Sequence, residues 1–157
     1  MESASPPRLS MQAAAEPSSL KMPAMPTLAE LSAFLSKEFP QTPCTIVAVG
    51  DRGATIRHTV GEAELRPGGT VSGPVMMATA DVALYVAILG EIGIVPLAVT
   101  TSLSFNFMRK PAGDRDILGV CKLLKLGRTL AVGEVTLYSE GSDEPVAHAV
   151  GTYAIPR

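Results

Sequence analysis

Residues 75–89 read VMMATADVALYVAIL, an apolar run in which Asp81 is the only charged side chain. Alanine and methionine favour helix, and the run lacks the alternation that is typical of a half-buried strand. The run therefore predicts a helix that is apolar nearly all round and buried on most of its faces. A carboxylate in such surroundings is costly unless something pairs with it, so Asp81 is a candidate functional residue.

A loop rich in glycine and proline, residues 61–74, leads into this helix. Pro74 suits the first helical turn, where a missing N–H does no harm. Ser72 then occupies the position before the helix, and serine is among the best residues at that position because its hydroxyl can accept a hydrogen bond from the first turn. The loop therefore predicts where the helix begins.

Helical spacing recurs near the start of the chain, and strand patterns fill most of the rest. After Thr27, which forms a capping-box pattern with Glu30, apolar residues repeat at helical spacing as far as Lys37 or Glu38. Runs that are rich in β-branched residues or that alternate in polarity predict six strands, over residues 44–49, 54–60, 97–108, 116–126, 130–139 and 146–155.

The order is helix, two strands, long helix and four strands, with short links between the last strands. This order predicts an α+β domain in which an antiparallel β-sheet wraps around the long central helix. The sheet covers one side of the helix. Because the other side is also apolar, we expect it to be covered by dimerisation.

The composition limits the class of protein. At 157 residues the chain has room for one domain, which we place at residues 26–157 after a Ser-, Pro- and Ala-rich tail, residues 1–25, that we expect to be disordered. The net charge of −2 and the aromatic content of 4% argue against a nucleic-acid partner. The longest apolar run is shorter than the roughly 20 residues that span a bilayer, so we expect no membrane partner.

Two cysteines, Cys44 and Cys121, lack the spacing of metal ligands or of a redox motif. We therefore expect no metal site, and cysteines that are reduced and buried in a cytoplasmic protein. No phosphate-binding glycine motif, nucleophile elbow or zinc-protease motif is present in the sequence.

Ser72-Gly73-Pro74 stands nine residues ahead of Asp81, and this spacing carries a resemblance. The chain resembles the hotdog-fold acyl-CoA thioesterases of the phenylacetate-degradation (PaaI-type) branch, in which a His-Gly-Gly tripeptide opens the central helix and a catalytic Asp lies nine residues after the His. The resemblance covers roughly Cys44 to the C-terminus. Further similar stretches are residues 106–111, 126–128 and 147–153.

The resemblance implies that Asp81 acts as nucleophile or as general base for water. Gly73 has no side chain to block close approach, and its backbone N–H can stabilise the negative charge on a thioester oxygen, aided by the helix dipole. Pro74 has no N–H, so any second donor is Val75. Asp81 lies about 12 Å along the helix from Gly73, so the two would act together across a dimer interface.

This chain departs from the pattern of the branch at several positions. Ser72 replaces the His, Pro74 replaces the second Gly, and Arg66 stands where the branch often has a polar amide. Tyr85 lies one turn after the Asp, where many relatives carry Thr or Ser. The resemblance implies substrate contacts by a group of residues around the helix start and the Asp: Ser72, Arg66, Pro74, Val75 and Tyr85.

Other interpretations of these residues remain open. Asp81 can instead be a structural acid paired with Arg66 or Arg57. Ser72 can simply cap the helix, Arg66 can be a solvated loop residue, and Tyr85 can serve packing or a dimer contact. We expect solvated or structural roles for the remaining polar candidates, namely His58, His148, Lys122, Lys125 and Arg128.

The leading hypothesis is an acyl-CoA thioesterase that works as a homodimer or a dimer of dimers and needs no cofactor, coenzyme A being part of the substrate. The alternative is a hotdog protein that binds an acyl ligand without hydrolysing it. A dehydratase of hydroxyacyl thioesters ranks last, because it usually needs a histidine paired with an acid near the helix, and no histidine directly precedes this helix or lies in it. The acyl group, the choice between coenzyme A and a carrier protein, and the role of Asp81 as nucleophile or base stay open.

Overall fold

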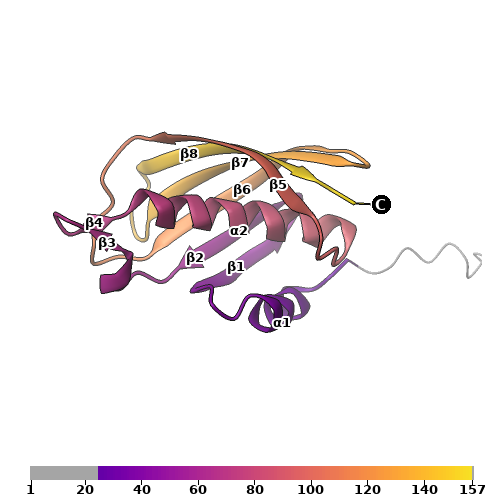
Figure 1. Ribbon diagram of the computed structural model, residues 1–157, viewed down its shortest axis with the longest axis horizontal. Coiled ribbons are helices and arrows are strands. Elements are labelled where there is room, and N and C mark those ends of the chain that lie inside the picture. Colours follow the sequence, from indigo (N-terminus) through magenta and orange to yellow (C-terminus); the bar gives the residue numbers. More distant parts are fainter. Residues whose placement is uncertain (1–24, 157) are drawn as a thin grey trace, which may run out of the picture.

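The computed structural model describes residues 25–156, so the expected tail lies outside the described residues except for Met25. The predicted α+β class is confirmed: a six-stranded antiparallel sheet wraps around one long helix (Figure 1). The sheet order is β1-β2-β6-β7-β8-β5. In chain order the elements are α1 (Leu28–Glu38), β1 (Cys44–Gly50), β2 (Gly53–His58), a 3₁₀ turn (Glu62–Glu64), β3 (Leu65–Arg66), β4 (Thr70–Val71), α2 (Gly73–Ile92), β5 (Val99–Phe107), β6 (Ile117–Leu126), β7 (Leu130–Ser139) and β8 (Pro145–Ala154).

The long helix α2 has the local signals that the sequence predicts. Ser72 is the N-cap residue with extended backbone angles, and Pro74 lies in the first turn. The helix ends at Gly93, whose φ of 97° is a conformation that glycine adopts readily. By length and composition α2 could cross a membrane, but most of it is buried inside this fold, as expected of a core helix.

Glycines on two neighbouring strands let α2 pack closely on the sheet. Gly133 of β7 and Gly151 of β8 are directly paired, and both lie under the side chain of Leu84. A Cβ at Gly151 would lie 2.4 Å from Leu84 Cδ1, and one at Gly133 would lie 2.7 Å from Leu84 Cδ2. Because Leu84 is fully buried, these glycines set how near the helix comes to the sheet.

The first helix, α1, lies beside β1 at the edge of the wrapped layer (Figure 1). Thr27 caps it by accepting a hydrogen bond from the Glu30 N–H at 3.1 Å, as predicted. Leu31 and Leu35 are buried, so one face of α1 joins the core. This contact brings α1 close to the middle of α2.

The segment between β2 and α2 differs from the prediction. The strand predicted over residues 54–60 ends at His58, because the N–H of Val60 bonds instead to Oδ1 of Asp116 at 2.9 Å. The expected loop contains the small hairpin β3–β4, which turns through Gly68 and Gly69 with φ of 100° and 77°. The hairpin lies beside the start of α2 (Figure 1).

Strand β5 forms one edge of the sheet. It pairs with β8 on one side and has no strand on the other among the described residues. It runs back along α2, so that its start lies near the middle of the helix and its end near the helix start. Large apolar residues along and beside β5 are exposed: Leu97, Val99, Phe107 and Met108.

Candidate active site

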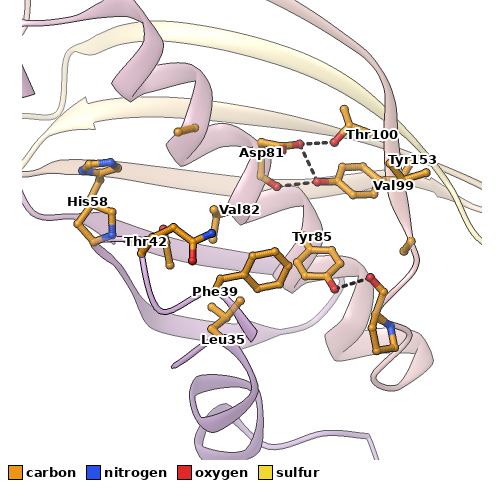
Figure 2. A pocket seen from close by; sticks show the side chains of 15 residues that line it. Leu35, Phe39, Thr42, His58, Asp81, Val82, Tyr85, Val99, Thr100 and Tyr153 are labelled. Carbon is orange, nitrogen blue, oxygen red and sulfur yellow. Dashed lines mark hydrogen bonds between the residues drawn. The ribbon is translucent and has the colours of Figure 1, made fainter. Parts of the chain in front are cut away.

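The carboxylate of Asp81 is held by two hydroxyl groups (Figure 2). The Thr100 hydroxyl donates to Oδ1 at 2.5 Å, and the Tyr153 hydroxyl donates to the same oxygen at 2.6 Å. The Tyr153 hydroxyl also lies 3.0 Å from the backbone oxygen of Asp81. Among the described residues no donor bonds to the second carboxylate oxygen, Oδ2, so that oxygen is available to a substrate or to water.

Tyr153 is a neutral donor at this site. Burial is the main cause that raises the pKa of its phenol, and the negative charge of Asp81 raises it further. The ring is fixed as well, because it stacks on Tyr85 with ring centres 6.2 Å apart. The phenol therefore keeps its proton and orients the Asp81 carboxylate.

A cavity of about 450 Å³ opens beside Asp81. Its walls are mostly apolar and come from α1, from the segment after α1, from α2 and from the start of β5. Tyr85 contributes its ring, while its hydroxyl donates to the Pro96 carbonyl at 3.0 Å. The Phe39 ring packs edge-on against the Tyr85 ring, with the ring centres 5.7 Å apart. The cavity has the size and lining of a small-molecule site.

The interpretation of Asp81 as a partner of Arg57 or Arg66 is wrong. Arg57 forms an ion pair with Glu140, at 2.7 Å from Nη2 to Oε1. Arg66 lies in the hairpin beside the start of α2 and does not line the Asp81 cavity. Asp81 is thus a half-buried carboxylate that is bonded to hydroxyls and faces a cavity, with no cation to neutralise it among the described residues.

Gly73 lies in a separate hollow of about 350 Å³ at the start of α2. Arg66, Arg109 and Lys110 line this hollow, together with the Phe107 ring. The N–H groups of the first turn of a helix have no partner within the helix, so those of Gly73 and Val75 are free of intrahelical bonds. Ser72 occupies the N-cap position, but its side chain makes no capping hydrogen bond.

The predicted site residues therefore fall into two groups. Asp81 and Tyr85 line one cavity, and Gly73 and Arg66 line the other. The three remaining predicted contact residues line neither cavity: Ser72, Pro74 and Val75.

Several residues of the Asp81 cavity carry no local sequence signal. Thr100 and Tyr153 are 19 and 72 residues from Asp81 along the chain, so only the fold brings them to it. Leu35 was predicted only as part of an amphipathic helix and Phe39 carried no prediction, yet both line the cavity. Helical periodicity shows that a face is buried and does not show that it borders a ligand site.

The two histidines differ in position. His148 lies outside the cavity and its Nε2 is 3.2 Å from Glu134 Oε2, in agreement with a structural role. His58 lines the cavity that holds Asp81. The sequence predicts a structural role for His58, and His58 reaches the cavity wall because it is the last residue of β2.

The described residues hold no group of three or more His, Cys, Asp or Glu side chains that is arranged to bind a metal. Cys44 and Cys121 are both buried and free. Burial raises the pKa of Cys121 to about 12, with a smaller contribution from the charge of Glu134, so its thiol stays protonated at neutral pH.

Solved structures share this architecture. A crystal structure from Silicibacter sp. TM1040, provisionally assigned as a thioesterase, is 50% identical over 85% of this chain and 96% of that chain, with a TM-score of 0.78. Thioesterase superfamily member 2 of zebrafish is 22% identical over 83% of this chain and 99% of its own, with a TM-score of 0.74. The PaaI protein of the E. coli phenylacetic acid degradation operon is 16% identical over 83% and 94%, with a TM-score of 0.71.

A hotdog-fold thioesterase is the class that this fold and these structures define, and the PaaI-type resemblance is confirmed at the level of the fold. The sequence model of the Thioesterase superfamily matches residues 68–146, about half of the chain. The protein belongs to the Thioesterase superfamily and is a thioester hydrolase. No curated protein matches the sequence.

Proposed function

We propose that this protein hydrolyses acyl-CoA thioesters, with Asp81 as nucleophile or general base. The observation that carries the proposal is the bonding of the Asp81 carboxylate. Two hydroxyls hold Oδ1, no described residue donates to Oδ2, and Asp81 lines a mostly apolar cavity. A carboxylate that is oriented in this way beside a cavity can take a proton from water or attack a carbonyl carbon.

In this mechanism the acyl group occupies the cavity and the thioester carbonyl lies near Oδ2. Asp81 either takes a proton from an attacking water or attacks the carbonyl carbon itself. Negative charge then develops on the carbonyl oxygen, and a backbone N–H at the start of α2 is suited to stabilise it. The thiolate of coenzyme A leaves as the carbonyl re-forms and takes up a proton. Where Asp81 is the nucleophile, water then cleaves the mixed anhydride, which releases the acid and regenerates the Asp81 carboxylate.

Within one chain the two parts of this site are too far apart. Asp81 lies about 12 Å along the helix axis from Gly73, and the two residues border different cavities. No single carbonyl can contact both. The second chemical group must therefore come from another copy of the chain.

Strand β5 supports a homodimer of a particular geometry. Its start contacts Asp81 through Thr100, and its end lies at Gly73, where the Phe107 ring is 3.4 Å from the position of an added Cβ. If two β5 strands pair antiparallel, the start of one lies beside the end of the other. Gly73 of one copy then approaches Asp81 of its partner.

The exposure along β5 also favours this pairing. Leu97 is 77% exposed and Val99 is 57% exposed, and a strand edge with such residues is a site for association. A dimer would also cover the exposed part of α2. A homodimer and a dimer of dimers would both cover these exposed surfaces.

The hollow at Gly73 suits the coenzyme. Arg66, Arg109 and Lys110 supply positive charge beside the proposed oxyanion donor. Coenzyme A carries phosphate groups, which such side chains bind well. We propose that Arg66 contacts the coenzyme, with Ser72 nearby, and that no other cofactor takes part.

The replacement Asp81→Asn tests the proposal. Asparagine keeps an oxygen that accepts the Thr100 and Tyr153 hydrogen bonds, so the fold is retained, but it can neither take a proton nor attack a carbonyl. We expect kcat on a panel of acyl-CoA thioesters to fall by about 10²- to 10⁴-fold. The measurement is thiol release, with the melting temperature as a check of folding.

Glu91→Gln is the matched control. Glu91 is another carboxylate of α2, and it accepts a hydrogen bond from the Arg52 N–H far from the cavity. This variant should keep wild-type activity. Unchanged hydrolysis in a folded Asp81→Asn protein removes Asp81 from the mechanism, and absence of turnover by the wild-type protein on every thioester favours the ligand-binding alternative.

A further inference from the structure

A second cavity lies next to the Asp81 cavity, at the end of α1. Its volume is about 160 Å³, and Ser36 lines it but does not line the Asp81 cavity. Three side chains line both cavities, namely Leu35, Phe39 and Thr42. Side chains that line two cavities lie between them. The two cavities are therefore separated by a wall that is one side chain thick.

Phe39 is the large side chain of this wall that the rest of the fold holds least. It is the C-cap residue of α1 and is half-buried, and its neighbours along the chain, Glu38 and Pro40, are both exposed. Leu35, by contrast, is a buried residue in the body of the helix. The Phe39 ring can therefore turn without displacing a core residue.

The ring against which Phe39 packs is fixed in place. Figure 2 shows the Phe39 and Tyr85 rings next to each other, and their centres are 5.7 Å apart. Tyr85 is only 7% exposed, its hydroxyl donates to the Pro96 carbonyl at 3.0 Å, and its ring stacks on Tyr153. Of the two rings, Phe39 is therefore the one that moves when a ligand needs the space.

The second cavity is the space into which the Phe39 ring can turn. Ser36 and Thr42 line it, and their hydroxyls make it a poorer environment for an aromatic ring than the contact with Tyr85. The ring therefore rests against Tyr85 in the free protein. A ligand shifts such an equilibrium only by contacts that it makes in one of the two states. An acyl group that is long enough to reach Phe39 makes its last contacts only after the ring has turned away.

We propose that Phe39 is a movable wall, which stays against Tyr85 when a short acyl group is bound and turns toward Ser36 to admit a longer one. This inference rests on the proposed function, since it assigns the acyl group to the Asp81 cavity. Phe39 is then a specificity residue for chain length and takes no part in the chemistry. The substrates that it serves are thioesters of unbranched, saturated acyl groups of varied length.

Filling the second cavity tests the inference without changing the lining of the Asp81 cavity. Ser36 is exposed, so Ser36→Phe places a ring in the space into which Phe39 would turn. The substrates are straight-chain acyl-CoA thioesters from butanoyl to hexadecanoyl, and the readout is kcat/KM of each relative to butanoyl-CoA. We expect this ratio to fall by about tenfold or more for the long members, because room for even one methylene changes kcat/KM by about that factor. Hydrolysis of butanoyl-CoA should stay at the wild-type rate.

Three further variants separate this effect from a general loss of folding. Lys37→Phe adds the same ring at the next position, which lines neither cavity, and should keep the wild-type profile of chain lengths. Ser36→Leu fills less of the second cavity and should give a weaker form of the same effect, with the melting temperature measured for each protein. Adding Phe39→Ala to Ser36→Phe removes the ring that has to turn, and should restore hydrolysis of the long members.

The outcomes separate this inference from the proposed function. A folded Ser36→Phe protein that keeps the wild-type profile, or that loses activity equally at every chain length, overturns the role of Phe39 and leaves Asp81 catalysis intact. Hydrolysis of the short members alone by the wild-type protein overturns it as well. If no thioester is turned over, the proposed function fails. Calorimetric binding of fatty acids of the same lengths to wild-type and Ser36→Phe proteins then decides the role of Phe39, and equal profiles overturn it.

Discussion

The two carboxylate oxygens of Asp81 differ in their hydrogen bonding. Oδ1 accepts from Thr100 and Tyr153, whereas Oδ2 accepts from no donor among the described residues, and Asp81 lines the cavity. The two hydroxyls hold the carboxylate in one orientation, and no described cation pairs with it. The side chain is thus oriented toward the cavity that it lines.

Tyr153→Phe tests this division at the level of one hydrogen bond. The ring and its stacking on Tyr85 remain, and only the hydroxyl is lost. We expect the free energy of unfolding to fall by about 1 kcal/mol. We also expect kcat/KM on a good acyl-CoA substrate to fall by about tenfold, a loss of about 1.4 kcal/mol of transition-state stabilisation, because the carboxylate turns more freely. Urea denaturation and steady-state kinetics measure the two effects.

This explanation requires that the free energy of unfolding and kcat/KM both fall in Tyr153→Phe. A Tyr153→Phe protein that loses stability but keeps full kcat/KM would show that Tyr153 serves packing alone.

The sequence could predict Asp81 but not its surroundings. The isolation of one carboxylate in an apolar helix is visible in fifteen consecutive residues, and the position of Gly73 follows from the helix start. Thr100 and Tyr153 reach Asp81 only because β5 and β8 pair along the helix, and Thr100 and Tyr153 face each other in that pairing. His58 was expected to be structural, and its place in the cavity wall could not be predicted, since a lone histidine at a strand end has no local pattern that marks it.

At the scale of the elements, the fold depends on how closely α2 approaches the sheet. The fully buried side chain of Leu84 lies over the paired Gly133 and Gly151, where any Cβ would clash with it. The helix carries Asp81 in the turn before Leu84. The glycine pair therefore also sets the distance between the carboxylate and the hydroxyls of the sheet.

Gly151→Ala should destabilise the protein by about 1–3 kcal/mol, the usual cost of overpacking a core. The new Cβ would lie 2.4 Å from Leu84 Cδ1 and 3.2 Å from Leu103 Cδ1. The measurement is the free energy of unfolding in urea. The double variant Gly151→Ala with Leu84→Val should be less destabilised than the sum of the two single changes, because valine removes the carbon that clashes.

Additive effects in that double-mutant cycle would show that the Leu84 contact is not the source of the strain.

Element prediction succeeded where patterns are long and failed where they are short. The strand predicted over residues 130–139 has the observed bounds of β7, and the helix predicted over residues 75–89 extends by two residues at its start and three at its end. The hairpin β3–β4 has two residues in each strand, too few to show alternation. Its turn depends on Gly68 and Gly69, which the sequence marks only as a loop.

At the scale of the whole molecule, one chain carries both halves of the proposed site at the two ends of β5. The halves are complementary, since each copy offers one Asp81 and one Gly73. An antiparallel pair of β5 strands would make two identical sites, as a two-fold dimer requires. The exposed apolar side chains of β5 and the unpaired strand edge both fit this arrangement.

The proposed oxyanion donor can be removed with little change to the helix. Gly73→Pro deletes the N–H at a first-turn position where proline is tolerated, and Ser72 already has the extended backbone, φ −73° and ψ 151°, that precedes a proline. Gly73→Ala adds a Cβ but keeps the N–H, and is the matched control. We expect kcat to fall by about 10²- to 10³-fold in Gly73→Pro and much less in Gly73→Ala.

Mixing two inactive proteins tests the shared site most directly. Asp81→Asn and Gly73→Pro proteins are denatured together, refolded, and assayed for acyl-CoA hydrolysis beside each variant refolded alone. A mixed dimer has one site with both an intact Asp81 and an intact Gly73, so random pairing should restore about one quarter of wild-type activity. Activity no higher than that of the separate variants, in mixtures where mixed dimers are present by native mass spectrometry, would contradict a site built from two subunits.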